Sequence, residues 1–199
     1  QFEAKLDDLK RQTFTFLHHR HSFDSGINWN DPALSHLWRY NLHYFDYAID
    51  LGYAARCQAD GRIWYELFRS FALSWIRHND LIGVGDGWHP YTISLRLVNW
   101  TYAYQLFEPY IQDDKEFCEA FLGSYWLQAE FLSRNAEWDV LGNHLVENGR
   151  ALVFAGLFTA GQAGCRWLRQ GLDILWGQLK EQALEDGGHY ERSPMYHQI

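Results

Sequence analysis

Hydrophobic side chains recur at intervals of three and four residues along most of the chain, a spacing that gathers them on one face of an α-helix. Sustained alternation of Val, Ile or Thr with polar residues, the pattern typical of a strand, is missing. We therefore predict an almost entirely helical chain. The expected helices cover residues 2–19, 31–49, 63–77, 90–107, 115–134, 143–161 and 166–184, and a further helix opens near Pro194.

Proline and glycine mark the boundaries of these helices. Asp31-Pro32 and Pro90 each place proline at a helix start, where its missing N–H costs nothing. Gly83, Gly85 and Gly87 predict a loop beside a cleft. A phosphate-binding loop is not predicted, because such a loop follows a strand and is followed by Lys-Ser/Thr, and this sequence has neither feature here. Seven or eight helices of this length predict stacked antiparallel pairs. An all-α fold, an incomplete α/α toroid whose inner helices surround a cleft, is the expectation, with a helical-repeat scaffold as the alternative.

Composition adds a size limit and an excess of aromatic residues. The 199 residues allow one domain, or a large piece of one, over residues 1–199. Ten Trp, twelve Tyr and thirteen Phe give 35 aromatic residues, more than a core of this size needs, so some rings are expected to line a surface or cleft. The net charge of −8 counts against nucleic acid as a partner and requires a local basic patch for any other polyanion.

Three further features limit the class of protein. The apolar stretches are far shorter than the roughly 20 residues of a membrane span. Cys57, Cys118 and Cys165 are odd in number and lack C-x-x-C spacing, which predicts buried thiols and neither disulfide nor zinc. The start carries no signal-peptide pattern, so such a segment is expected to be absent or already removed. Because the chain also stops inside a helical start, we expect a fragment of a longer protein.

Four segments combine aromatic and polar residues densely, and most begin at an expected helix N-terminus, where backbone N–H groups favour a negatively charged ligand. In the third segment, Asn143, His144 and Glu147 share one helical face. In the fourth, Ser193-Pro194 places Tyr196 in a first turn, where the helix dipole favours phenolate. Each such residue could instead be a cap or a satisfied core donor. An H-E-x-x-H motif is missing, so neither a metal nor another cofactor is predicted.

These four segments together resemble the bacterial heparinase II/III-like polysaccharide lyases, relatives of the alginate lyases. The resemblance rests on residues 37–46 (LWRYNLHYFD), 88–96 (WHPYTISLR), 143–148 (NHLVEN) and 187–197 (GGHYERSPMYH). It implies an α/α toroid followed by a C-terminal β-sandwich domain that completes the cleft and is missing here. An isolated helical fragment is accordingly expected to be weakly active or inactive.

The resemblance also implies a reaction, the β-elimination of a glycosidic bond beside a uronic acid in an acidic polysaccharide such as a glycosaminoglycan. Asn143 matches the donor that neutralises the uronate carboxylate, His144 the base, and Tyr196 the acid, sometimes also the base. Glu147 would orient His144 or bind sugar. We predict substrate contacts from residue type and location for Trp38, Arg39, Asn41, His43, Tyr44, Trp88, His89, Tyr91, Arg96, Asn99, Glu147, His189, Glu191, Arg192 and His197, and stacking on sugar also for Trp100.

Two other functions stay open from the residues alone. A toroid glycoside hydrolase would use two carboxylates, with Glu147, Asp186 or Glu191 as candidates. A non-catalytic glycan-binding or scaffold domain would use the aromatic rings without turnover. For a bacterial lyase of this kind the periplasm or the exterior is the expected compartment, with the cytoplasm as the alternative.

Overall fold

A computed structural model describes residues 2–140 and 143–182. Helices dominate these residues, and a single two-stranded hairpin lies near the N-terminus. The elements in chain order are α1 (Phe2–Lys10), β1 (Thr13–Phe16), β2 (His19–Ser22), α2 (His36–Tyr44), α3 (Tyr47–Cys57), α4 (Gly61–His78), the 3-10 helix η1 (Asp86–Trp88), α5 (Pro90–Asp113), α6 (Lys115–Arg134), α7 (Asn143–Phe158) and α8 (Gly161–Gln182).

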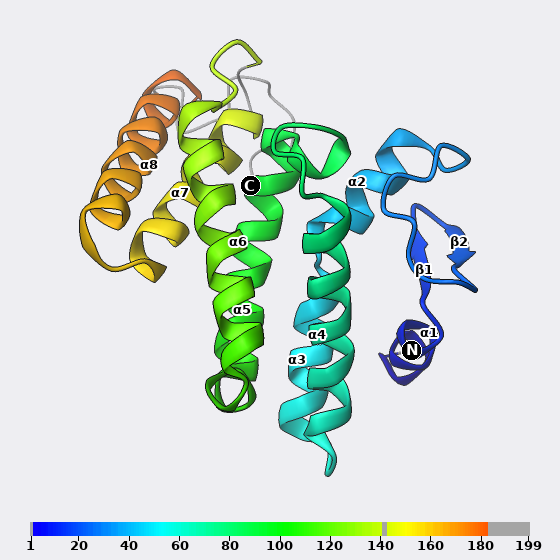
Figure 1. Ribbon diagram of the computed structural model, residues 1–199. Coiled ribbons are helices and arrows are strands. Elements are labelled where there is room, and N and C mark those ends of the chain that lie inside the picture. Colours follow the sequence, from blue (N-terminus) through cyan, green and yellow to red (C-terminus); the bar gives the residue numbers. More distant parts are fainter. Residues whose placement is uncertain (1, 141–142, 183–199) are drawn as a thin grey trace.

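The long helices stand side by side, with the β1–β2 hairpin at one edge of the molecule and α8 at the other (Figure 1). Helix α5 is the central element, because it packs against α2, α3, α6 and α7. The pairs α3–α4 and α7–α8 flank it on its two sides. The arrangement is the predicted one of stacked antiparallel helix pairs.

Aromatic rings fill the space between these helices. Trp100 of α5 is fully buried, and its ring lies 4.6 Å from that of Phe121, 5.5 Å from Phe45 and 5.7 Å from Trp75. Seven of the ten tryptophans are buried. Most of the tryptophan surplus therefore stabilises the core, and fewer of these rings are available to a ligand than the composition suggested.

The predicted helix over residues 2–19 is wrong beyond Lys10. Strand β1 pairs with β2 in antiparallel register from Thr13–Ser22 to Phe16–His19, which leaves a turn of two residues, Leu17 and His18. Both turn residues have positive φ, 53° and 63°. Asn-Gly or Asp-Gly is the usual sequence for such a turn, so the pair Leu-His gave no signal of a hairpin.

The predicted helix over residues 31–49 is two helices. Ser35, and not Asp31, caps α2, and its side chain accepts a hydrogen bond from the backbone N–H of Trp38 at 3.3 Å. Phe45 then ends α2 in the left-handed conformation, with φ 61°. Its ring is completely buried and stacks on Trp29 at 5.4 Å, and this packing offsets the cost of an uncommon backbone conformation.

The remaining helices confirm the prediction, with shifted ends. Helix α6 spans the predicted residues, and α4 and α7 differ at their ends by three residues or fewer. Helix α5 continues to Asp113, six residues beyond its predicted end, and α8 begins at Gly161, five residues early. The expected helix near Pro194 lies outside the described residues.

Cys57 and Cys165 are exposed and Cys118 is partly buried, so the predicted burial of all three thiols is wrong. Within residues 2–140 and 143–182, no helix has the length and apolar character of a membrane span.

Candidate functional site

Three parts of the fold converge at one end of α5: helix α2, the η1–α5 junction and the start of α7. They bring together His89 and Tyr91 from α5, His144 from α7, and Tyr40 and Tyr44 from α2. His89 caps α5, because its Nδ1 accepts a hydrogen bond from the backbone N–H of Tyr91 at 3.3 Å. We define these five residues together with Glu137 as the histidine–tyrosine cluster.

Glu137, which precedes α7, is the acidic member of this cluster. Its Oε1 lies 2.9 Å from Nδ1 of His144 and 3.8 Å from Nε2 of His89. The carboxylate side chain is only 8% exposed, whereas the two histidine side chains are 32% and 37% exposed. A buried carboxylate therefore supports two imidazoles that solvent or a ligand can reach.

The tyrosines surround the two imidazoles. The ring of Tyr91 lies 4.3 Å from that of His144, and the ring of Tyr40 lies 5.2 Å from that of His89. Burial, reinforced by the carboxylates of Asp86 and Glu137, raises the pKa of Tyr40 to about 12. Burial also raises the pKa of Tyr44. Both phenols are thus protonated near neutral pH and act as hydrogen-bond donors.

His89 is neutral under the same conditions. Burial lowers the pKa of its imidazole, the nearby His144 and His36 lower it further, and the Glu137 carboxylate opposes this shift. Because Nδ1 accepts the capping hydrogen bond, the proton of neutral His89 sits on Nε2, the nitrogen nearer to Glu137. Neutral His89 therefore offers an N–H donor at Nε2 and carries no charge.

A second polar group borders the cluster along α2. Arg39 donates from Nε to Asp86 at 2.5 Å and from Nη1 to the backbone carbonyls of Asp31 and Leu34. His36 lies 3.1 Å from the other carboxylate oxygen of Asp86. The positive charge of Arg39 is therefore already matched by Asp86.

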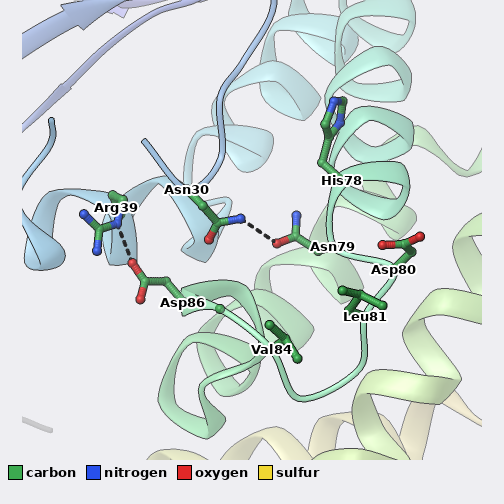
Figure 2. A pocket seen from close by; sticks show the side chains of 9 residues that line it. Asn30, Arg39, His78, Asn79, Asp80, Leu81, Val84 and Asp86 are labelled. Carbon is green, nitrogen blue, oxygen red and sulfur yellow. Dashed lines mark hydrogen bonds and ion pairs between the residues drawn. The ribbon is translucent and has the colours of Figure 1, made fainter. Parts of the chain in front are cut away.

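Arg39 and Asp86 also form one wall of a pocket of about 460 Å³. Figure 2 shows Arg39 facing Asp86 and, beside them, Asn30 facing Asn79. The apolar part of the lining comes from the loop after α4, with Leu81 and Val84. With two carboxylates, Asp80 and Asp86, against the one guanidinium of Arg39, the pocket does not supply a basic patch.

Several predicted ligand contacts belong instead to the core. Trp38, Trp88 and Trp100 are at most 4% exposed and pack against other rings, so they cannot stack on a sugar. His43 is completely buried and accepts a hydrogen bond at Nδ1 from Nε1 of Trp75 at 2.9 Å. These four predictions are wrong because Trp38 packs against the β1–β2 hairpin and the other three residues pack against neighbouring helices.

Arg96 and Glu147 both bond to other residues of the described structure. Arg96 is fully buried and donates to the carbonyls of His43 and Gly87 and to the side chain of Gln128. Glu147 is buried and bonds Nε of Arg150 at 2.8 Å. The predicted uronate contact of Arg96 is therefore wrong, because its guanidinium is bonded to other residues inside the core. Nδ1 of His144 pairs with Glu137 and not with Glu147, and the alternative, that Glu147 binds sugar, stays a prediction.

Of the other predicted site residues, some lie within the described part of the chain and some lie outside it. Asn41 and Asn99 are partly buried and donate to the backbone carbonyls of Leu37 and Tyr44, both at 2.8 Å, and no hydrogen bond from the described part of the chain engages their amide oxygens. Asn143 is partly buried and begins α7 beside His144. Tyr196, His189, Glu191, Arg192 and His197 lie outside the described residues.

Four residues of this region were not predicted as ligand contacts or catalytic groups: Glu137, Tyr40, His36 and Asp86. Glu137 lies in a loop seven residues before His144, and a loop has no periodicity that would show which way a side chain points. Tyr40 could have been found, because it lies one helical turn from both His36 and Tyr44 on α2. Within the described ranges, no three His, Cys, Asp or Glu side chains are grouped closely enough to hold a metal ion.

Comparison with known proteins gives a consistent family match. The profile described as Heparinase II/III N-terminus matches residues 5–199. A heparin-sulfate lyase of Bacteroides stercoris is 28% identical over 221 residues, which cover 98% of this chain and 33% of that protein. A heparin-sulfate lyase of Pedobacter heparinus is 28% identical over 183 residues, covering 88% of this chain and 27% of the relative.

Solved structures give the same result for the fold. A heparinase III structure superposes with a TM-score of 0.81 at 26% identity, covering 99% of this chain and 34% of that one. A heparan sulfate lyase of Pedobacter heparinus superposes with a TM-score of 0.83 at 25% identity, covering 98% and 31%. The predicted fold class, an incomplete α/α toroid, is confirmed. The chain spans a third or less of the length of the curated relatives it matches.

Proposed function

Because the chain belongs to the heparinase II/III family, through that family's N-terminal domain, we propose that it is the helical part of a polysaccharide lyase. The substrate class is an acidic, uronate-containing polysaccharide, and heparan sulfate is the first to test, since the similar curated proteins are named heparin-sulfate lyases. The remaining part of the cleft is supplied by a C-terminal β-sandwich domain. A bacterial source and a periplasmic or secreted location suit such a substrate, and fractionation of the source cells tests the compartment.

The observation that carries this proposal is the histidine–tyrosine cluster beside the start of α7. β-Elimination requires a base for the C5 proton of the uronate, an acid for the departing O4 and a donor for the charge that develops on the carboxylate. His144 is a partly exposed imidazole supported by a buried carboxylate, which suits the base. Asn143 is the adjacent amide in the first turn of α7, which suits the donor.

Tyr196 completes the proposal as the acid. It lies outside the described residues, so its assignment rests on the motif over residues 187–197 alone. Tyr40 and Tyr44 lie on the α2 side of the cluster and are protonated phenols, which suits hydrogen bonding to sugar hydroxyls. Asn41, Asn99, His89 and Tyr91 remain proposed substrate contacts, as do His189, Glu191, Arg192 and His197.

The charge balance of the described site limits how it could hold a uronate. Arg39 is paired with Asp86, and Glu137 and Asp86 are both acidic. The carboxylate of a substrate would therefore be met by Asn143 and by the backbone N–H groups at the start of α7, where the helix dipole favours an anion. Arg39 contributes to substrate binding in this proposal by holding Asp86 and the rim of the cleft.

Absorbance and reducing-end assays on one set of reactions test the reaction type. The full-length protein is incubated with heparan sulfate, hyaluronan and alginate, and the ultraviolet absorbance of the unsaturated uronate product is followed beside the number of new reducing ends. A rise in both signals together supports elimination. New reducing ends without the absorbance show hydrolysis, and binding without either signal shows a non-catalytic glycan-binding domain; either result contradicts the proposal.

The acid is tested separately by Tyr196→Phe in the full-length protein. Removal of the phenolic O–H removes the proton that O4 needs, so we expect turnover to be abolished while substrate binding is largely retained. Initial rates and equilibrium binding of the same polysaccharide measure both quantities. Turnover near the wild-type rate would take Tyr196 out of the mechanism.

A further inference from the structure

Glu137 lies next to both histidines of the histidine–tyrosine cluster. One carboxylate oxygen, Oε1, faces Nδ1 of His144 at 2.9 Å and Nε2 of His89 at 3.8 Å. The carboxylate is almost completely removed from solvent, with 8% of the side chain exposed. A buried carboxylate at hydrogen-bond distance interacts strongly with an imidazole N–H and more strongly with an imidazolium.

The position of Glu137 is fixed from α7 and α5. Asn148 holds it at both ends, because its Oδ1 accepts the backbone N–H of Glu137 at 2.7 Å and its Nδ2 donates to Oε2 at 3.1 Å. The same Nδ2 contacts Oγ of Ser94 at 3.0 Å, and the Ser94 hydroxyl donates to the carbonyl of Pro90. Asn148 and Ser94 are fully buried. The carboxylate is thus held in one orientation, with Oε2 bound to Asn148 and Oε1 directed at the histidines.

This orientation decides which nitrogen of His144 carries the proton. An ionised carboxylate only accepts hydrogen bonds, so His144 must donate from Nδ1. The neutral ring then bears its lone pair on Nε2, and no hydrogen bond from the described residues reaches that atom. Nε2 is the nitrogen that can take a proton from a bound molecule.

We propose that Glu137 is a positioning residue that fixes the Nδ1–H tautomer of His144 and leaves Nε2 as the base. The catalytic part of this inference rests on the proposed lyase function, and the tautomer part does not. When Nε2 takes up a proton, the imidazolium lies against the carboxylate and is stabilised by it. Among the described residues, the uncharged His89 and the protonated Tyr40 neighbour Glu137, the ring of Tyr91 lies 4.3 Å from that of His144, and the carboxylate of Asp86 is paired with His36 and Arg39.

Glu137→Gln tests the inference without changing the shape of the side chain. Asn148 Nδ2 continues to donate to the amide oxygen, so the amide NH₂ of the new side chain faces Nδ1 of His144. The ring must then accept at Nδ1 and carry its proton on Nε2, where it can no longer act as a base. We expect kcat to fall by about 10⁴-fold, the loss typical when the carboxylate behind a catalytic histidine becomes an amide, with KM nearly unchanged.

The tautomer is measured directly on the protein by ¹⁵N NMR of labelled histidine. We expect the wild-type His144 to carry its proton on Nδ1 and the Glu137→Gln variant to carry it on Nε2. Glu130→Gln is the matched control. Glu130 is also a mostly buried carboxylate, but its partners are Arg134, Arg166 and Trp167, so neither kcat nor the His144 tautomer should change.

Each outcome decides between supporting and overturning the proposal. A wild-type His144 without a proton on Nδ1 overturns it even if the variant fails to fold. A switched tautomer with kcat within a few-fold of wild type overturns the catalytic part. A switched tautomer in a protein whose wild type eliminates no polysaccharide supports the positioning role and contradicts only the lyase function.

Discussion

Individual residues of the same type serve opposite purposes in this molecule. His144 is partly exposed and pairs with a carboxylate at the cleft, whereas His43 is completely buried and accepts a hydrogen bond from Trp75. Burial, and to a smaller extent the charge of Arg96, lowers the pKa of His43 well below its ordinary value. The first histidine can take part in proton transfer, and the second is a neutral part of the core.

Asn143→Ala removes the proposed donor to the uronate carboxylate. If Asn143 stabilises the charge that develops in the transition state, the barrier should rise by about 2.7–4 kcal/mol, the range typical of an oxyanion-hole donor. This corresponds to a loss of about 10²–10³ in kcat. Initial rates of the full-length protein on the polysaccharide that it cleaves give the value, and an unchanged kcat would contradict the role.

The neutral, buried His43 predicts a pH-dependent stability. The unfolded chain takes up a proton on this residue near pH 6.5, and the folded chain does so only at much lower pH, so the unfolded state binds more protons below about pH 6.5. The free energy of unfolding should therefore fall as the pH drops through this value, by up to about 1.4 kcal/mol per pH unit.

Urea unfolding at a series of pH values measures this slope. In the His43→Gln variant, the amide oxygen can still accept from Trp75 but does not titrate, so we expect a lower stability overall and a flatter dependence between pH 6.5 and 5. His89 contributes a slope of the same sign in both proteins, because its pKa is also lowered. An equal slope in the variant and the wild type would show that His43 is not the titrating group.

At the scale of elements, the α7–α8 pair depends on close backbone contact. A Cβ atom at Gly156 would come within 2.5 Å of the backbone nitrogen of Leu168, and one at Gly171 would lie 2.6 Å from the carbonyl oxygen of Gly149. These distances are shorter than any contact that a real Cβ makes with backbone atoms. Glycine at these positions lets the two helices pack backbone to backbone, and this brings the start of α7 into a fixed position.

Gly171→Ala should separate the two helices and lower the free energy of unfolding by about 1–3 kcal/mol, the typical cost of overpacking a close contact. Gly177→Ala on the same helix is the matched control, because no atom lies within 4 Å of the added Cβ. Alanine is the better helix former by about 1 kcal/mol, so this control should be as stable as the wild type or more stable. Chemical denaturation of the three proteins compares them, and equal losses in both variants would contradict the close-contact explanation.

At the scale of the whole molecule, one buried cation joins the elements that carry the site. Arg96 of α5 donates to the carbonyl of His43 in α2 at 3.1 Å, to the carbonyl of Gly87 in η1 at 2.7 Å and to Gln128 of α6 at 2.7 Å. Its guanidinium also lies 4.0 Å from the ring centre of Trp75 in α4. The relative positions of α2, η1 and α5, and therefore of Tyr40 and His89, depend on this side chain.

Arg96→Met should be strongly destabilising. It would leave three buried acceptors without a donor, and each unsatisfied group costs about 1–3 kcal/mol, so a loss of about 3 kcal/mol or more is expected. Arg62→Met is the control, because Arg62 forms an exposed pair with Glu66 one turn away and should change stability by less than about 1 kcal/mol. Urea unfolding measures both variants, and similar small effects would show that Arg96 does not hold these elements together.

The sequence by itself determined helices α4 to α8 and the family. Apolar spacing depends only on the near neighbours of each residue, so the period of 3.6 residues located α4 to α8 to within a few residues at most ends, and Pro90 marked the start of α5. The pair Asn143-His144 and the motifs around it were likewise readable, because they are continuous in the chain. The β1–β2 hairpin could not be predicted from the sequence, because its turn uses Leu17 and His18 in place of the usual turn residues.

Only the tertiary structure decided which of these polar and aromatic residues face the cleft. Trp88 and Arg96 look like ligand contacts in the sequence, and they are buried because α4 and α6 pack over them. Glu137 looks like an ordinary loop residue, and it becomes the partner of His144 because Asn148 of α7 holds its carboxylate in place. The side of a helix that is buried follows from what packs against it, and that contact joins residues far apart in the chain.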